Sequence, residues 1–134
     1  MREYYEGKVA AVTGGGSGIG LALCEMMLSL GSKAVVLADI NEPTMAREAA
    51  RLDEKYPGRA FGVRTDVASQ ESVQAMVKRA AELGGGRLDL LFNNAGLGLS
   101  GAFDDASDAD WKRAFDINFY GALYGIRVLI NKLF

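Results

Sequence analysis

Histidine is absent from this sequence of 134 residues, and Cys24 is its single cysteine. Zinc sites built from cysteine and histidine ligands are therefore excluded. Ser-His-Asp and Cys-His catalysis are excluded too, because both need an imidazole that accepts and returns a proton. No disulfide can form within the chain, which favours a reducing compartment, and we expect a cytoplasmic protein.

Clusters of basic charge and long apolar runs are also missing. Fifteen Lys and Arg oppose seventeen Asp and Glu, which gives a net charge of -2, and the basic residues are scattered along the chain. We therefore expect no nucleic-acid partner, since such binding needs a basic patch. The first six residues are polar and acidic, and Glu25 and Arg127 interrupt the later apolar runs. Neither a signal peptide nor a membrane span is expected.

The composition of the chain is that of a folded domain. Hydrophobic residues make up 49% and charged residues 24%, which is close to the average for soluble domains. A chain of this length typically forms one domain and buries about 70% of the surface of its unfolded state. We expect a single domain over residues 1–134.

Apolar runs alternate with helical patterns along the chain. Strands are predicted at residues 8–13, 34–40, 60–67 and 88–92. Helices, with their capping residues, are predicted at 19–30, 41–56, 69–83 and 107–133. This alternation predicts an α/β fold, a doubly wound parallel sheet with helices on both faces.

A glycine-rich segment joins the first predicted strand to the first predicted helix. Residues 13–20 read T-G-G-G-S-G-I-G and hold five of the seventeen glycines. Glycines at a helix N-terminus let a pyrophosphate approach the partly positive backbone N–H groups. A Walker A site is excluded, because Leu21 and Ala22 stand where the required Lys and Ser/Thr would be, so nucleotide hydrolysis is not expected. The strict G-x-G-x-x-G pattern fails as well, and the spacing that fits is Gly14-x-x-x-Gly18-x-Gly20. A tight turn with close helix packing is the alternative interpretation.

Asp39 strengthens the nucleotide interpretation. It lies nineteen residues beyond Gly20, at the end of the second predicted strand. A carboxylate there can accept hydrogen bonds from both hydroxyls of a ribose and repels a 2′-phosphate. No Arg or Lys adjoins it, since Ile40, Asn41 and Glu42 follow, so we predict NAD in preference to NADP. The alternative is that Asp39 merely begins the next helix.

Five motifs then occur in order and carry a resemblance to a known family. They are the glycine-rich segment 13–20, Asp39, the pair Asp66-Val67, the run Asn93-Asn94-Ala95-Gly96, and Asn118 within D-I-N-F. Together they resemble a classical short-chain dehydrogenase/reductase, and the resemblance extends over essentially the whole chain. The chain corresponds to the amino-terminal, cofactor-binding half of such an enzyme. The implied fold is the first half of a Rossmann-type sheet with strand order 3-2-1-4.

The resemblance implies a set of cofactor contacts. The glycine-rich segment would hold the pyrophosphate, with the Ser17 hydroxyl and the Ile19 backbone among the contacts, and Asp39 would hold the adenosine ribose. Asp66 would meet the adenine amino group and Val67 the face of the ring. The full set of implied cofactor-binding residues is Gly14, Ser17, Gly18, Ile19, Gly20, Asp39, Ile40, Asp66, Val67, Asn93, Ala95 and Gly96.

The Asn93-Asn94-Ala95-Gly96 run follows the fourth predicted strand. The resemblance implies that Asn93, Ala95 and Gly96 line the floor beneath the nicotinamide, and that Asn93 also ties this strand to its neighbour. A plain turn at the end of the strand is the alternative for the Asn-Asn dipeptide.

Asn118 is the one candidate catalytic residue. It is a polar amide on an otherwise apolar helical face, between Phe115 and Phe119, and such an amide needs a partner. The resemblance implies that it holds a water in a proton-relay path. The alternative is a buried amide at a local distortion of the helix. Trp111, Phe115, Phe119 and Cys24 are predicted to be core residues.

The resemblance implies hydride transfer between NAD and an alcohol or carbonyl substrate, with a tyrosine as acid/base, a lysine that lowers its pKa, and a serine that polarises the carbonyl. The places of these three residues follow the helix that contains Asn118, beyond Phe134. Tyr4 and Lys8 have a Tyr-x-x-x-Lys spacing, but they precede the first strand and would lie at the wrong end of the sheet.

Two functions are therefore compatible with the sequence: part of an NAD-dependent oxidoreductase, or an NAD-binding module without catalysis. A third, a relative of nucleoside-sugar epimerases, is disfavoured by the Asn93-Asn94-Ala95-Gly96 run. The substrate and the direction of reaction cannot be read, because only residues 97–103 would border the substrate. An uncovered fourth strand and the apolar face of the last helix predict a homo-oligomer. No metal ligand set is expected.

Overall fold

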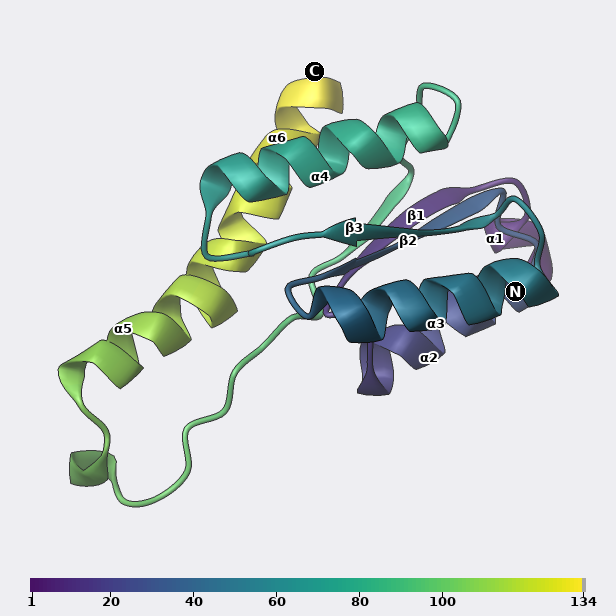
Figure 1. The fold of residues 1–134 in the computed structure, drawn as a ribbon. Coiled ribbons are helices and arrows are strands. Elements are labelled where there is room, and N and C mark those ends of the chain that lie inside the picture. Colours follow the sequence, from purple (N-terminus) through teal and green to yellow (C-terminus); the bar gives the residue numbers. More distant parts are fainter. Residues whose placement is uncertain (134) are drawn as a thin grey trace.

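The computed structural model describes residues 1–133, which form a four-stranded parallel sheet flanked by helices. The strands lie in the order β3-β2-β1-β4, which confirms the predicted doubly wound sheet. Their bounds are β1 Val9–Thr13, β2 Ala34–Asp39, β3 Ala60–Arg64 and β4 Leu90–Phe92. The chain adds β2 and β3 on one side of β1 and then crosses back to add β4 on the other (Figure 1).

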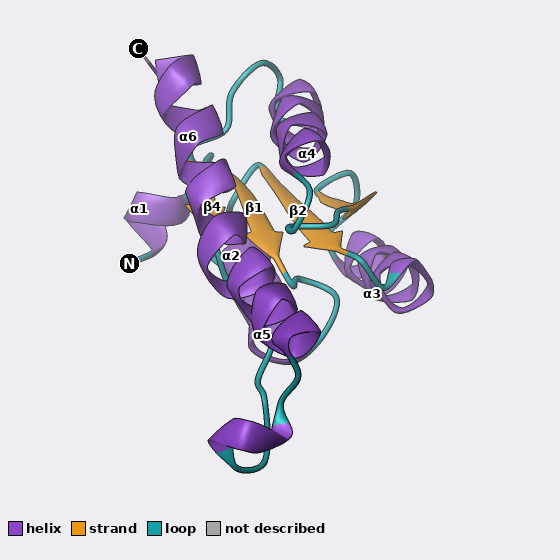
Figure 2. Cartoon of the chain, turned by 90° about the vertical axis from the view of Figure 1, so that its left-hand side faces the viewer, coloured by secondary structure: helices purple, strands orange, loops and turns teal. Residues whose placement is uncertain are grey.

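Helices cover both faces of this sheet. Figures 1 and 2 show α2 and α3 on one face and α4 and α6 on the other. Their bounds are α1 Arg2–Tyr5, α2 Gly18–Ser29, α3 Glu42–Lys55, α4 Gln70–Leu83, the 3-10 turn η1 Phe103–Asp105, α5 Asp108–Phe115, the π-helical segment η2 Asp116–Tyr120 and α6 Gly121–Leu133. None of the helices in residues 1–133 has both the length and the apolar character that crossing a bilayer requires.

Alternate side chains of the central strand β1 enter two separate core layers. Ala10 and Val12 pack with residues of α2 and α3, whereas Ala11 packs with residues of α4. Every residue of β1 is buried, as expected for the middle of a parallel sheet covered on both faces. Cys24 is fully buried in the first layer, as predicted, and this burial raises the pKa of its thiol to about 12.

β3 ends at Arg64, before the predicted boundary at Val67. The Thr65 N–H still donates to the Asp39 carbonyl at 2.9 Å, but the next N–H, that of Asp66, donates to the Ser72 side chain at 2.9 Å. This second bond turns the chain toward α4. Residues 65–67 therefore lie on a loop at the carboxyl edge of the sheet.

The long helix predicted over residues 107–133 is interrupted. It begins as predicted, with the Ser107 hydroxyl accepting the Asp110 N–H at 3.2 Å. Residues 116–120 then form a π-helical turn between α5 and α6. A π turn holds more residues than an α turn, so a stripe drawn at constant α-helical spacing does not stay on one face.

Phe115 and Phe119 are each 58% exposed, so the prediction that they belong to the core is wrong for the described residues. The buried residues of this helical segment are small ones instead: Ala114, Gly121 and Gly125. A methyl group on Gly121 would come within 3.0 Å of the Val67 side chain, so the helix lies as close to the sheet as glycine allows. Phe115 and Phe119 face outward, whereas Val128 and Leu129 of α6 pack against the core layer that contains Ala11.

Trp111 is half-buried, although it was predicted to lie in the core. Its ring packs against Phe103 of the preceding 3-10 turn, with the ring centroids 5.1 Å apart. Figure 2 shows this turn and α5 projecting from the body of the sheet. Trp111 therefore joins α5 to the preceding 3-10 turn and does not reach the main core.

Candidate functional site

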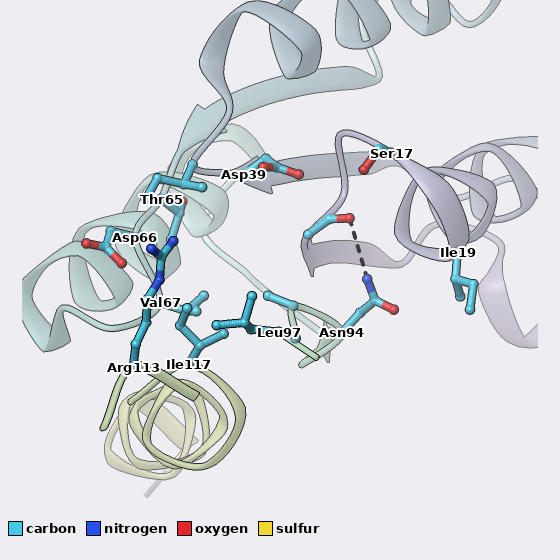
Figure 3. Close-up of a pocket in the computed structure, with 14 residues that line it drawn as sticks. Ser17, Ile19, Asp39, Thr65, Asp66, Val67, Asn94, Leu97, Arg113 and Ile117 are labelled. Carbon is cyan, nitrogen blue, oxygen red and sulfur yellow. Dashed lines mark hydrogen bonds between the residues drawn. The ribbon is translucent and has the colours of Figure 1, made fainter. Parts of the chain in front are cut away.

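A cavity of about 450 Å³ lies at the carboxyl ends of the strands. Residues at or just after the carboxyl ends of all four strands line it, together with one residue of α5 and one of η2 (Figure 3). The lining residues are Gly14, Ser17, Ile19, Asp39, Ile40, Thr65, Asp66, Val67, Asn94, Ala95, Gly96, Leu97, Arg113 and Ile117. In doubly wound sheets ligands bind at this edge, where the strand order reverses.

Glycine is required at several positions of the 14–20 loop, for two different reasons. Gly14 and Gly18 have φ angles of 66° and 54°, in the left-handed region that other residues rarely adopt. A methyl group on Gly20 would collide with the Gly14 carbonyl, and one on Gly16 would lie 2.9 Å from an Asp39 carboxylate oxygen. The turn-and-packing interpretation is therefore correct for Gly16 and Gly20, while Gly18 has open space where its side chain would be.

The N-terminus of α2 faces this cavity without a side-chain cap. Ser17 is the N-cap residue, and its hydroxyl makes no capping hydrogen bond. By contrast, Asn41, Ser69 and Ser107 cap α3, α4 and α5 with their side chains. The first N–H groups of α2 have no partner within the helix. An anionic ligand at this position would satisfy them and interact favourably with the helix dipole.

Asp39 links the end of β2 to the glycine-rich loop. One carboxylate oxygen accepts the Gly16 N–H at 2.9 Å, and the other accepts the Asn41 N–H at 3.0 Å. The helix that follows is capped by Asn41, so beginning that helix is not the principal role of Asp39. Each carboxylate oxygen has further lone pairs, which remain available to ligand hydroxyls in the cavity.

Asp66 and Val67 form the end of the cavity next to β3. Asp66 is fixed by two backbone bonds: its own N–H donates to Ser72, and its carboxylate accepts the Ala68 N–H at 3.0 Å. Val67 is buried against Gly121 at the start of α6. The pair therefore presents one acceptor and one apolar surface to the cavity, each in a fixed position.

Asn94, which was not among the predicted site residues, ties β4 to β1. Its Nδ2 donates to the carbonyls of Thr13 at 3.1 Å and Gly14 at 3.4 Å, and the second bond is drawn in Figure 3. The Thr13 hydroxyl in turn accepts the N–H groups of Asn94 and Ala95, both at 3.1 Å. This network fixes the loop after β4 against the glycine-rich loop.

Asn93 was predicted to make that tie and to line the cavity, and the structure corrects both expectations. Its side chain is exposed and lies beside α6, with its Oδ1 2.7 Å from where a methyl group on Gly125 would be. The alternation of the strand explains the exchange: Leu91 packs on the α4 and α6 side and Phe92 on the α2 side. Residues two apart on a strand share a face, so Asn93 lies on the same face as Leu91, and Asn94 lies on the same face as Phe92, toward the glycine-rich loop. Counting this alternation in the sequence would have identified Asn94.

Asn118 lies in the π-helical segment and holds the loop after β4. Its Oδ1 accepts the Leu97 N–H and its Nδ2 donates to the Leu97 carbonyl, both at 2.7 Å. It is exposed and does not line the large cavity, but borders a smaller hollow of about 290 Å³ beside Phe115 and Phe119. An amide at a helix distortion was one of the two interpretations considered, and the amide is not buried.

Arg113 and Ile117 also line the cavity and were missed by sequence reasoning. They lie four residues apart, one turn along the helical segment, and Figure 3 shows both beside Val67. Their spacing is visible in the sequence, but only the folded chain brings them to the residues after β3. Four predicted site residues lie outside the lining: Gly18, Gly20, Asn93 and Asn118.

The Tyr4 and Lys8 pair lies away from this cavity. Lys8 precedes β1, and its ammonium group lies 5.5 Å from the centre of the Tyr4 ring. Both residues are therefore at the amino end of the sheet, as the sequence predicted. No group of three potential metal ligands occurs within residues 1–133.

Known proteins resemble this chain in sequence and in structure. Residues 8–134 match the short chain dehydrogenase family. An uncharacterized oxidoreductase of Thermotoga maritima is 39% identical over 116 residues, which cover 87% of this chain and 44% of the relative. A short chain dehydrogenase/reductase from Burkholderia phymatum, solved in complex with NAD, is 42% identical and has a TM-score of 0.88, with 95% of this chain and 44% of that chain covered.

An NADPH-dependent 3-quinuclidinone reductase from Rhodotorula rubra is similar in fold as well. It has a TM-score of 0.84 at 30% identity, with 93% of this chain and 47% of that chain covered. The chain spans about half the length, or less, of the curated relatives it matches.

Proposed function

Because the chain belongs to the short-chain dehydrogenase family, we propose that it binds NAD and forms the cofactor-binding part of an oxidoreductase. The enzyme would transfer a hydride between NAD and an alcohol or carbonyl substrate. The observation that carries this proposal is the uncapped N-terminus of α2, which opens onto a cavity that also contains Asp39.

The residues of the cavity fit a dinucleotide. Free N–H groups at Gly18 and Ile19, with the Ser17 hydroxyl, would hold the pyrophosphate. Asp39 would accept the hydroxyls of the adenosine ribose, and Asp66 would accept the adenine amino group. Ile40, beside Asp39, would line the adenosine, while Ala95 and Gly96 would lie beneath the nicotinamide. When bound, NAD supplies the hydride acceptor.

Asp39 is also the reason to propose NAD over NADP. Its carboxylate is held by the Gly16 and Asn41 N–H groups, so it cannot turn away from a ligand without breaking hydrogen bonds. A 2′-phosphate would meet this fixed negative charge. Similar structures include one solved with NAD and one described as NADPH-dependent, so the preference rests on Asp39 and not on the relatives.

Asn118 would act on the substrate side of the site. By holding both polar backbone groups of Leu97, it fixes the start of the 97–103 segment that would border the substrate. We propose that its amide also places a water in the proton path, as the family resemblance implies. The substrate would be a small alcohol or carbonyl compound.

The first test is binding by the purified chain. Asp39→Ala should weaken NAD binding about tenfold or more, because it removes a charged acceptor, and should relax discrimination against NADP. Titration calorimetry with NAD and NADP measures both effects. Glu54→Ala is the matched control, since it removes an exposed carboxylate of α3 that does not line the cavity. Unchanged affinities for both cofactors in Asp39→Ala would refute the assignment.

A second test addresses the chemistry. The chain is incubated with NAD and a panel of alcohols, and NADH formation is followed by absorbance. Turnover would place oxidoreductase activity within these residues. Binding of NAD without turnover would assign to them the role of an NAD-binding module.

A further inference from the structure

We propose that Arg113 is a cofactor-binding residue whose guanidinium covers the outward face of the adenine ring. This inference rests on the proposed function and adds a cofactor contact that the sequence motifs do not contain. It starts from a simple observation: Arg113 is the one Lys or Arg among the fourteen lining residues, all of which lie in the described part of the chain.

The position of Arg113 points to the adenine end of the cavity. Figure 3 shows its side chain extending from α5 toward Thr65 and Asp66, at the end of β3. The glycine-rich loop, where the pyrophosphate would bind, follows β1, and β2 lies between β1 and β3. Arg113 therefore lies on the adenine side of the site.

The guanidinium is available for a ligand. Within residues 1–133, no carboxylate lies within 4.0 Å of Arg113, and no side-chain hydrogen bond of Arg113 is formed. The adjacent Lys112 is paired instead with Asp116. Arg113 is exposed, so its position does not depend on packing in the core.

The chemistry of the surrounding groups separates two tasks. The adenine amino group is a donor, so it pairs with the Asp66 carboxylate and not with a guanidinium, which has donors only. A guanidinium is planar and stacks on aromatic faces. With Val67 and Ile117 as apolar walls, Asp66 reads the edge of the base and Arg113 covers its face.

The proposal is tested by calorimetric titration of the wild-type chain, Arg113→Met and Arg127→Met. Arg127 is an exposed arginine of α6 outside the cavity lining, so it is the matched control. The probes are NAD, AMP and nicotinamide mononucleotide. Arg113→Met should weaken NAD and AMP by the same factor, about 5- to 30-fold, and leave the mononucleotide unchanged. Arg127→Met should leave all three unchanged.

A further ligand and a further variant distinguish stacking from other roles of Arg113. Deamino-NAD, which carries hypoxanthine, should lose as much affinity as NAD in Arg113→Met, because stacking does not depend on the amino group. Arg113→Lys keeps the charge without the plane, so AMP affinity should stay reduced. Full recovery in Arg113→Lys would show that positive charge, and not the planar guanidinium, is what the site needs. A loss for NADP larger than for NAD would show attraction to a phosphate. Either result would overturn the proposal.

Wild-type affinity for AMP in Arg113→Met would also overturn the inference while leaving the proposed function intact. If the wild-type chain bound none of the probes, the proposed function itself would fail. A loss that extends equally to nicotinamide mononucleotide would show a general effect on the site and would overturn the adenine assignment.

Discussion

At the residue scale, Asn94 is the clearest case of a side chain that acts as part of the backbone. Its amide nitrogen donates to the Thr13 and Gly14 carbonyls, where β1 turns into the glycine-rich loop. These carbonyls belong to residues with no β4 strand partner at that level, because the β1–β4 pairing stops at Val12 and Phe92. The Asn94 side chain thus continues the hydrogen bonding between β1 and the chain after β4 beyond the last strand pair.

Asn94→Ala should lower the free energy of unfolding by about 1–3 kcal/mol, because the carbonyls of the buried Thr13 and the half-buried Gly14 lose a donor. Asn93→Ala removes the same group one residue earlier, from an exposed position, and should cost no more than about 0.5 kcal/mol. Urea denaturation of both variants measures the difference. Equal losses would show that Asn94 does not carry the link.

At the element scale, α2 is placed by contact and not by capping. Its N-terminus is uncapped, and its first turn approaches the loop so closely that Gly20 touches the Gly14 carbonyl. Leaving a helix uncapped costs about 1 kcal/mol. That cost is understandable at a position where a ligand would supply the missing hydrogen-bond partner.

Gly20→Ala should have two opposing effects on stability: a gain from the helix propensity of alanine and a loss from a steric overlap at the start of α2. Alanine in a helix is favoured over glycine by about 1 kcal/mol, yet its methyl group would overlap a backbone carbonyl that cannot move aside like a side chain. We expect a net loss of stability of at least about 1 kcal/mol, together with weaker NAD binding.

Thermal unfolding and calorimetry of Gly20→Ala report the two effects. Gly98→Ala is the control, because nothing lies within 4 Å of the added methyl group at that position. A Gly20→Ala variant as stable as the control would show that the loop moves freely, contrary to the geometry.

At the scale of the whole molecule, large apolar side chains of the helical segment after β4 remain open to solvent. Phe115 and Phe119 are each 58% exposed, Ile126 is 48% and Ile130 50% exposed. Within the described residues, β4 also pairs with β1 alone. Exposed apolar surface of this kind marks an interaction site.

We therefore expect the purified chain to self-associate at micromolar concentration. Light scattering should give a mass above the 14.3 kDa of one chain, and Phe119→Ser should shift the population toward the monomer. Glu54→Ala, on the opposite side of the sheet in α3, should not. A wild-type chain that remains monomeric would refute this expectation.

Local sequence patterns predicted the parallel sheet and most of the cavity residues, and the family resemblance implied the strand order. Strand and helix periods are local, and the glycines of the loop, Asp39 and Asp66 lie at or just after strand ends, so their position at the carboxyl edge follows from a parallel sheet. The folded chain placed the residues that local patterns missed. It alone brought Arg113 to Val67, placed Asn94 and not Asn93 on the loop, and turned Phe115 outward through a π-helical turn. Each of these depends on contacts between residues far apart in the chain, which local periodicity does not encode.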